Sequence, residues 1–450
     1  MPNLWIVAAV AIPIRAATVA AGRKNGRTIA VLAATISLAC LVASTLSGAA
    51  NISWLRLDDV AALPAFLFAA VMLAAFTTAP ERDAGGSTCA ALLTALSGTL
   101  IIYTAEAMAI VFVGWILSMA PLFKRSTGSN RHRVYERPVV MLLLSAGLLG
   151  VAAALLTFGE VGVVAPWAFG LAVTAALIRS GIFPFHSWMI TAFEEEKMLS
   201  VISLASAQAG AFLIVRLAAP GFAEPARFVL PFLSALALFS TVLMAFMALG
   251  EIVPRRILGL VIVSQSGFII SGLELSNIQG ITGALVHWLA VSASTAGLLI
   301  VLRALEVRYG WLGGEPFLGL GTRAPRFAVL FLLFALALVG LPGTLGFCGE
   351  DLLFHGAIES HPVLGLALPL ATAISAVQLF RLFSRLFLGK RGIHVPAIAD
   401  CLPRERWALT ALALFLLAGG FAPYFVIQSR IGPARSIADV LVGKTVARLK

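Results

Sequence analysis

The stretch RSGIFPFHSW, residues 179–188, interrupts a long apolar run. AFGLAVTAALI precedes it and MITAF follows it. An arginine, a proline and a histidine within eight positions are poor choices for a helix in lipid, where ionisable side chains are costly and usually face a protein interior. The stretch therefore predicts a polar site inside a membrane.

Pro184 predicts that the helix breaks at this site. Proline lacks a backbone donor and clashes with the preceding turn, and the freed groups need partners or water within a bilayer. Helices broken in mid-membrane recur at ion-binding sites. Arg179 and His186 are seven residues apart, which in an unbroken helix places them on one face. A simple proline kink with a snorkelling arginine stays open as an alternative.

The composition indicates one polytopic membrane domain over residues 1–450. The chain is 60% hydrophobic and only 12% charged, with a mean hydropathy of +0.99, more apolar surface than a soluble domain can bury. The net charge of +11 does not predict nucleic-acid binding, because the basic residues lie in short loops between apolar spans. That placement is typical of the positive-inside rule.

The apolar runs predict about fourteen spans, or thirteen if the nearly continuous fourth and fifth are one. They are 2–21, 28–50, 58–79, 88–103, 105–123, 138–157, 164–190, 198–219, 228–250, 256–273, 279–302, 326–349, 362–388 and 405–428.

Basic residues follow the odd-numbered spans, which predicts that those loops face the cytoplasm and both termini face away from it. They are Arg23, Lys24, Arg27, Lys124, Arg125, Arg131, Arg133, Arg137, Arg255, Arg256, Arg303, Arg308, Arg323, Arg326, Lys390, Arg391, Arg404 and Arg406. The basic tail 430–450 does not fit this pattern: it is an amphipathic surface segment, or the count is off by one.

A second break is predicted in GLPGTLGFCGEDLLFH, residues 340–355, at Pro342. The two broken spans are five spans apart, and an odd offset inverts one copy in the membrane. This pattern predicts an inverted repeat with a site at the midplane. The expected fold is thus an all-α polytopic bundle with two broken helices.

Other ionisable residues in the spans are Glu106, His287 and Glu350, with Asp351 beside the last. His287 titrates near physiological pH and can carry a proton; a structural histidine bonded to a carbonyl is the alternative. Glu106 lies near a span junction, where an interfacial position is equally open. The uncharged polar neighbours are Ser206, Gln208 and Gln265.

No motif predicts a metal site or a catalytic centre in this chain. The four cysteines are scattered without a CxxC pair, so neither zinc nor an iron–sulfur cluster is expected. HExxH, nucleophile-elbow and P-loop patterns are lacking. We expect no catalytic residue, no metal and no cofactor.

Four motifs resemble the antiporter-like membrane subunits of respiratory complex I. They are IRSGIFPFHSW (178–188), LASAQAGAFLIVR (204–216), PRRILGLVIVSQSGF (254–268) and GLPGTLGFCGE (340–350), with LRLDDVAAL (55–63) as a weaker echo. The chain is similar also to Mrp-type cation/proton antiporters, membrane-bound hydrogenases and the membrane half of inorganic-carbon uptake systems. The resemblance covers roughly residues 50–390.

The resemblance implies an all-helical bundle with two inverted five-helix repeats, at approximately 88–220 and 228–388. It also implies a proton path through polar residues at the midplane. The family's lysine on the first broken helix falls on Arg179, its acidic residue on the second falls on Glu350, and its histidine before the central lysine falls on His287. Three positions differ from the family. Ile116, after Trp115, stands where the family has its key glutamate, Thr295 stands where it has a lysine, and Ala207 stands where some relatives have a lysine.

Arginine at position 179 has a chemical consequence. A buried lysine can lose its proton, but an arginine effectively cannot, so Arg179 is a poor relay group. The residues assigned to the predicted path are Arg179, His186, His287, Glu350 and Glu106.

The leading interpretation is a proton-translocating or cation/proton-translocating membrane subunit of a larger complex, of the NADH dehydrogenase-like (quinone) type, with no redox centre of its own. Two alternatives stay open: a membrane subunit of a proton-driven inorganic-carbon uptake system, and a non-conducting structural subunit. The expected partners are other membrane or peripheral subunits, the lipid bilayer, and protons or monovalent cations. We expect a multi-pass location in a bacterial-type inner (plasma) membrane.

Overall fold

The computed structural model describes most of the chain. The described residues are 2–47, 51–52, 54–123, 136–218, 222–275, 277–313, 317–389 and 399–442. Several predicted basic loop residues lie outside this set, namely Lys124, Arg125, Arg131, Arg133, Lys390 and Arg391, together with the end of the basic tail.

The first half of the chain holds two short strands and eleven helices. They are α1 (Pro2–Ala20), α2 (Gly26–Leu46), β1 (Asn51–Ile52), β2 (Leu55–Arg56), α3 (Ala62–Thr78), α4 (Gly86–Thr104), α5 (Met108–Ser118), α6 (Ala120–Phe123), α7 (Glu136–Phe158), α8 (Val161–Ser180), α9 (Ser187–Glu195), α10 (Met198–Ala205) and α11 (Ala209–Leu217). The strands pair antiparallel, with Ile52 opposite Leu55.

The second half is helical throughout its described part. Its elements are α12 (Ala223–Leu249), α13 (Pro254–Leu273), α14 (Ile278–Tyr309), η2 (Leu320–Thr322), α15 (Pro325–Leu338), α16 (Leu345–Ser360), α17 (Pro362–Phe387), α18 (Pro403–Phe421) and α19 (Pro423–Val442).

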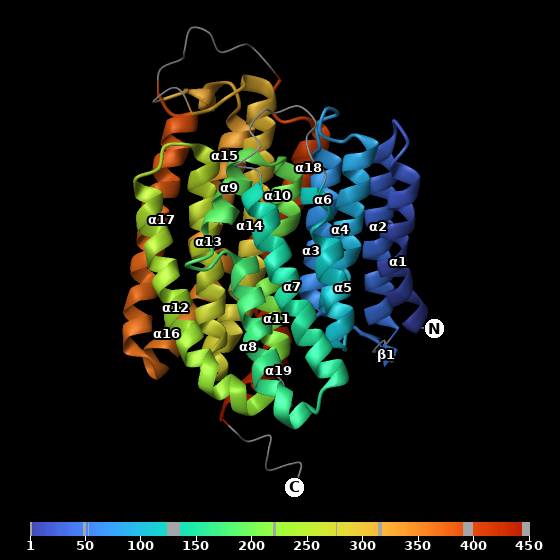
Figure 1. Ribbon diagram of the computed structural model, residues 1–450. Helices are drawn as coiled ribbons and strands as arrows, with labels where there is room; N and C mark the ends of the chain where they lie inside the picture. The colour runs from blue at the N-terminus through green and yellow to red at the C-terminus, as the bar shows by residue number, and fades with distance from the viewer. Residues whose placement is uncertain are drawn as a thin grey trace.

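The helices form one upright bundle, and the predicted spans are confirmed (Figure 1). Among the described residues, nine helices are long and apolar enough to cross a membrane, α18 qualifies together with α19, and four shorter apolar helices complete the set. These correspond one to one with the fourteen predicted runs. The chain is therefore a multi-pass membrane protein. α1 and α2 lie at one edge of the bundle, and α12, α16 and α17 lie at the other.

The centre of the bundle is a pair of fully buried helices. All the described positions of α13 from Ile257 to Leu273 are buried, and α14 is buried from Gly280 to Leu302. This burial explains why these two spans hold polar side chains such as Gln265 and His287 without exposing them to lipid.

Both predicted helix breaks are present. α8 ends at Ser180, where Gly181 takes a φ of +67°, and Pro184 follows before α9 begins. α15 ends at Leu338 and α16 begins at Leu345, with Pro342 between them. Each broken helix is the fourth of its predicted repeat, although the boundaries of the repeats remain a prediction.

A third break was not predicted. The span 198–219 is divided into α10 and α11 at Gln208, which has a φ of +46°, a conformation that is uncommon for a residue with a side chain. The phenol of Tyr103 on α4 donates a hydrogen bond to the carbonyl of Ala207 at this break. A backbone carbonyl freed from helical bonding thus finds a partner, as burial requires.

The end of the chain corrects the last predicted span. α18 ends at Phe421, and α19 turns away from it by 82°, crossing the lower end of the bundle in Figure 1. The described part of the basic tail is therefore a transverse helix, in agreement with the surface-segment alternative. Its Arg430 is buried and donates a hydrogen bond to the carbonyl of Val60.

An ion-pair network ties the helices at the upper end. Arg303 of α14 pairs with Asp83 at 2.7 Å, and Arg255 of α13 pairs with Glu306 at 2.6 Å. Both contacts are bidentate, a geometry that orients the helices as well as binding them. Basic residues predicted to mark the cytoplasmic loops therefore also fix the helix ends.

Glu274, just beyond α13 at the opposite end, makes stability depend on pH. Burial raises the pKa of its carboxyl, opposed by a hydrogen bond with Ser234 and the charge of His361. The folded state therefore holds this proton to higher pH than the unfolded state, and stability falls as the pH rises through this interval. We expect Glu274→Gln to flatten the fall in melting temperature as the pH rises above the ordinary pKa of a glutamate, about 4.3.

Melting scans in detergent at a series of pH values check this expectation. Glu359→Gln is the control, because Glu359 is an exposed carboxyl at the same end of the bundle. A Glu274→Gln profile as steep as that of the wild type would show that Glu274 does not carry the pH dependence.

Candidate functional site

Arg179 is held inside the bundle at the end of α8. It is 3% exposed, donates a hydrogen bond from Nη2 to Ser118 Oγ at 2.9 Å, and places its guanidinium carbon 5.4 Å from the ring centre of Trp115. The indole of Trp115 donates in turn to Ser145 Oγ at 3.1 Å. The arginine is thus positioned by packed neighbours from α5.

No carboxylate neutralises Arg179 within the part of the chain that the structure describes. No ion pair reaches its guanidinium, and Nη1 is buried without a hydrogen-bond partner there. A buried cation without a counter-ion is costly. This unpaired charge is the most unusual electrostatic feature of the site.

His186 does not share a face with Arg179. The expectation of one face assumed a continuous helix, but α8 ends at Ser180, so the spacing of seven no longer applies. His186 is half-buried at the start of α9 and stacks on Phe183 with ring centres 5.8 Å apart. Phe183 packs on Phe239 of the outer helix α12. The break therefore directs Arg179 inward and leaves His186 at the periphery.

Glu106 is also remote from the buried residues. It lies between α4 and α5, its side chain is 44% exposed, and its carboxylate is 3.7 Å from the guanidinium of the exposed Arg56. The helical backbone is interrupted there, and α5 starts at Met108. The interfacial alternative for Glu106 agrees with this placement, and we leave it out of the candidate site.

His287 and Gln265 form the polar contact between the two central helices. Both side chains are fully buried, and His287 Nε2 lies 2.8 Å from Gln265 Oε1. Because an amide oxygen only accepts, this contact places the histidine proton on Nε2 and leaves Nδ1 as an acceptor. The second nitrogen of each residue, His287 Nδ1 and Gln265 Nε2, has no partner among the described residues.

Glu350 faces the free nitrogen of His287. Its Oε1 lies 4.0 Å from His287 Nδ1, a distance that one water or a small side-chain rotation converts into a hydrogen bond. The carboxyl is 4% exposed, and its other oxygen packs against Gly340, which has a φ of +69°. The second helix break thus makes room for the carboxyl beside the imidazole.

Close packing of α14 on α16 brings His287 and Glu350 together. A Cβ on Gly349 would lie 2.6 Å from the backbone nitrogen of His287 and 2.7 Å from its Cα. Gly283 faces the backbone of Leu353 in the same way. Glycines on both helices therefore permit an approach that no larger residue allows.

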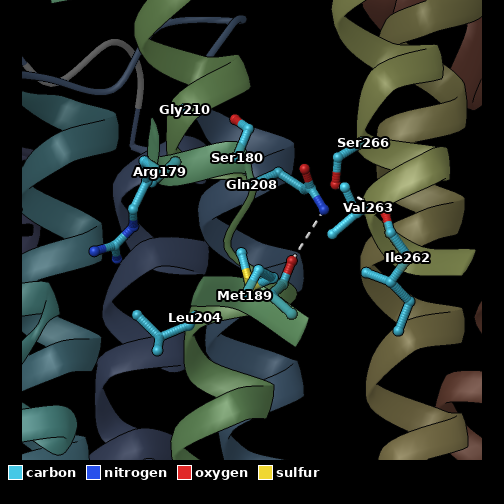
Figure 2. A pocket seen from close by; sticks show the side chains of 11 residues that line it. Arg179, Ser180, Met189, Leu204, Gln208, Gly210, Ile262, Val263 and Ser266 are labelled. Carbon is cyan, nitrogen blue, oxygen red and sulfur yellow. Dashed lines mark hydrogen bonds between the residues drawn. The ribbon is translucent and has the colours of Figure 1, made fainter. Parts of the chain in front are cut away.

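A small cavity lies between Arg179 and the central helices. Its volume is about 10 Å³, close to the minimum for one water molecule. Figure 2 shows Gln208 and Ser266 on one side of it, with the guanidinium of Arg179 pointing away. The buried hydroxyl of Ser180, which lines it, lacks a partner among the described residues. The site therefore consists of a fixed cation and a titratable pair, separated by uncharged polar groups.

The positions where the family keeps other charged residues are uncharged here and lie in different environments. Ile116 is 41% exposed, whereas its neighbour Trp115 is the residue that contacts Arg179. Thr295 is fully buried with its hydroxyl unpartnered within the described residues. Ala207 is the residue whose carbonyl binds Tyr103. Trp115, Ser118 and Tyr103 were not predicted, because nothing in an apolar run shows which residues face a distant arginine.

Replacing Gln265 with leucine should destabilise the protein by about 1–3 kcal/mol, the cost of a buried donor left unsatisfied on His287. It should also release the tautomer preference of the imidazole, which ¹⁵N NMR of His287 detects. Gln378→Leu is the control, because that buried amide has only long contacts of 3.3 and 3.5 Å. Equal losses for both variants would contradict the special role of Gln265.

Among the described residues, no group of three or more His, Cys, Asp or Glu side chains is arranged to hold a metal ion. The proton-exchanging groups of the site are His287 and Glu350.

Comparisons with known proteins agree with the fold. The sequence pattern of the family described as "NADH:quinone oxidoreductase/Mrp antiporter, TM" matches residues 62–375. The NADH-ubiquinone oxidoreductase chain 4 of Chondrus crispus is 28% identical over 269 residues, which are 59% of this chain and 54% of that protein. NADH-quinone oxidoreductase subunit 13 of Thermus thermophilus is 31% identical over 266 residues, 58% of this chain and 55% of that one. The matched segments span about half the length of these curated relatives.

Solved structures share the architecture over nearly the whole chain. A chain of respiratory complex I from Thermus thermophilus superposes with a TM-score of 0.85 at 23% identity, covering 97% of this chain and 99% of that one. A chain of the Mrp complex from Dietzia sp. DQ12-45-1b superposes with a TM-score of 0.86 at 18% identity, covering 99% of each. With the family pattern matched over well more than half of its length, the chain belongs to the NADH:quinone oxidoreductase/Mrp antiporter transmembrane family.

Proposed function

We propose that this chain is a proton-translocating, antiporter-like membrane subunit. The observation that supports the proposal is the buried pair of His287 Nδ1 and Glu350 Oε1, 4.0 Å apart at a helix break. Ionisable groups placed inside a membrane bundle usually mark an ion or proton path. A carboxyl and an imidazole each bind and release a proton, so this pair offers a proton two exchange sites.

The residues take distinct parts in the proposed path. Glu350 as an acid donates its proton to His287 Nδ1, and the imidazole, then carrying two protons, releases the one on Nε2 toward the polar residues beside Gln265. Arg179 keeps its charge and acts as a fixed electrostatic barrier or guide. Rotation of side chains or entry of water completes the connection across the cavity of about 10 Å³.

We further propose that the chain works within a larger complex in a bacterial plasma membrane. The similar proteins are named as NADH-quinone oxidoreductase subunits, and the similar structures are chains of respiratory complex I and of an Mrp complex. No redox group is needed in this chain if partner subunits supply the driving reaction. Partners of the NADH:quinone oxidoreductase kind are therefore the first to seek.

A second candidate is a structural subunit that no longer conducts. It is favoured by the fixed charge of Arg179, by Ile116 where the family has a glutamate, and by the small volume of the central cavity. Under this alternative, the subunit needs the packing of α13 against α14 but does not need Glu350 to gain or lose a proton.

Purification from native membranes tests membership in a complex, and reconstitution tests conduction. We expect membrane subunits to co-purify, and we expect proton uptake into liposomes that hold the assembly or the chain alone. Purification of a lone chain would contradict the partner proposal. An assembly that pumps equally well with His287→Ala and Glu350→Gln together would support the structural candidate instead.

A further inference from the structure

An apolar groove runs along the outside of the bundle between α3 and α18. Its volume is about 610 Å³. Its lining is almost entirely hydrocarbon, contributed by Leu63, Phe66, Leu67, Ala70, Leu73 and Ala74 of α3, Ala408, Leu412 and Phe415 of α18, and Leu38 of α2. Neither His287 nor Glu350 lines it, and it has no part in the proposed path.

The only charged residue that lines the groove, among the residues that the structure describes, lies at one end. Arg404 in the first turn of α18 borders it, beside Trp407, and Arg404 Nε is buried with no partner in the described chain. Arg406 places its guanidinium carbon 5.5 Å from the ring centre of Trp407. Arg27 approaches the same end, donating to the carbonyl of Ala79 just past α3. The groove is thus apolar along its length and cationic at its mouth.

The length of the groove suits a lipid chain. Leu63 to Thr77 on α3 and Arg404 to Phe415 on α18 correspond to lengths of about 21 and 16 Å. The length is comparable to one leaflet of a bilayer, roughly 15 Å of hydrocarbon.

We propose that this groove binds one acyl chain of an anionic phospholipid, with the lipid phosphate at Arg404. The ligand must be an amphiphile, because apolar lining and positive charge are separated to opposite ends of one groove. Basic pockets between transmembrane helices are known to take anionic headgroups, and an aromatic residue such as Trp407 suits the headgroup level. The unpartnered Nε of Arg404 gains a charge-assisted hydrogen bond.

Photolabelling tests the proposal on the full chain in nanodiscs of equal parts phosphatidylglycerol and phosphatidylcholine. In each of two preparations, one of the lipids carries a photoreactive group on its acyl chain, and labelled peptides are identified by mass spectrometry. We expect phosphatidylglycerol to label α3 and α18 about fivefold more than phosphatidylcholine does. Arg404→Gln should remove that preference, and Ala411→Phe on the groove wall should reduce labelling by both lipids.

Arg326→Gln is the matched control, since Arg326 is an exposed arginine at the same end of the bundle and outside the groove. Equal labelling by the two lipids, or an equal change in Arg326→Gln and Arg404→Gln, would show an ordinary annular surface and overturn the proposal. A photoreactive group attached to Ala411→Cys gives a second test in the native complex. Its crosslinking to a partner chain instead of lipid would overturn the proposal as well. Melting curves confirm that each variant is folded.

Discussion

Replacing Gly349 with alanine should separate α14 from α16 and abolish most of the proton flux. The added Cβ would lie 2.6 Å from the backbone nitrogen of His287 and 2.7 Å from its Cα, and backbone atoms cannot rotate away. Overpacking of this kind costs about 1–3 kcal/mol. The helices must move apart, so the distance between His287 and Glu350 grows beyond 4.0 Å. The melting temperature and the flux in liposomes should both fall.

Gly147→Ala is the matched control for that prediction. Gly147 lies on an exposed face of α7, where an added Cβ would meet nothing within 4 Å, and alanine is the better helix former by about 1 kcal/mol. We expect this variant to be as stable as the wild type or more so. A Gly349→Ala protein with wild-type stability and flux would show that the contact between α14 and α16 does not set the geometry of the site.

Replacing Arg179 with methionine should stabilise the protein, although it removes two favourable contacts. The hydrogen bond to Ser118 contributes about 1.5–3 kcal/mol, and the contact with Trp115 contributes about 2 kcal/mol. Burying an ion costs several kcal/mol, and no carboxylate repays it within the described chain. The net expectation is a gain of about 1–3 kcal/mol, measured by denaturation in detergent.

Arg430→Met should have the opposite sign. Arg430 is equally buried, at 3% exposure, but it donates to the carbonyl of Val60 and is attracted by Asp58 and Asp59. Its removal leaves these groups without their cation. If Arg179→Met destabilises the isolated chain as much as Arg430→Met does, the contacts of Arg179 with Ser118 and Trp115 outweigh the cost of burying its charge.

The overall fold could be predicted because lipid imposes a simple rule on sequence. Every spanning segment must be an apolar helix, so the fourteen runs could be read directly. Pro184 and Pro342 marked two of the breaks because ionisable residues lie near each of them, whereas Pro231 and Pro369 lie inside continuous helices. The break at Gln208 could not be read, because it depends on a tertiary contact from Tyr103 to the carbonyl of Ala207.

The residue types of the site could be predicted from the sequence, but the directions in which their side chains point could not. His287 and Glu350 were identified because charge is rare in spans, and the structure brings them together. His186 and Glu106 satisfied the same criterion, yet they lie at the periphery, half-buried and exposed. A break in a helix changes the direction in which every later side chain points. The number of residues between two positions on either side of Gly181 therefore did not show whether they share a helix face. Glycine contacts between α14 and α16 likewise depend on pairing that a single sequence does not display.

Proton flux through Glu350→Gln is the measurement that tests the central claim most directly. Asp351→Asn is its matched control, since that carboxyl is the next residue on α16 but faces outward with its side chain 49% exposed. We predict that Glu350→Gln lowers flux into liposomes by roughly 100-fold, as expected for loss of a proton-transfer group, and that Asp351→Asn leaves it unchanged. Equal flux in the wild type and in Glu350→Gln would contradict a proton path through His287 and Glu350.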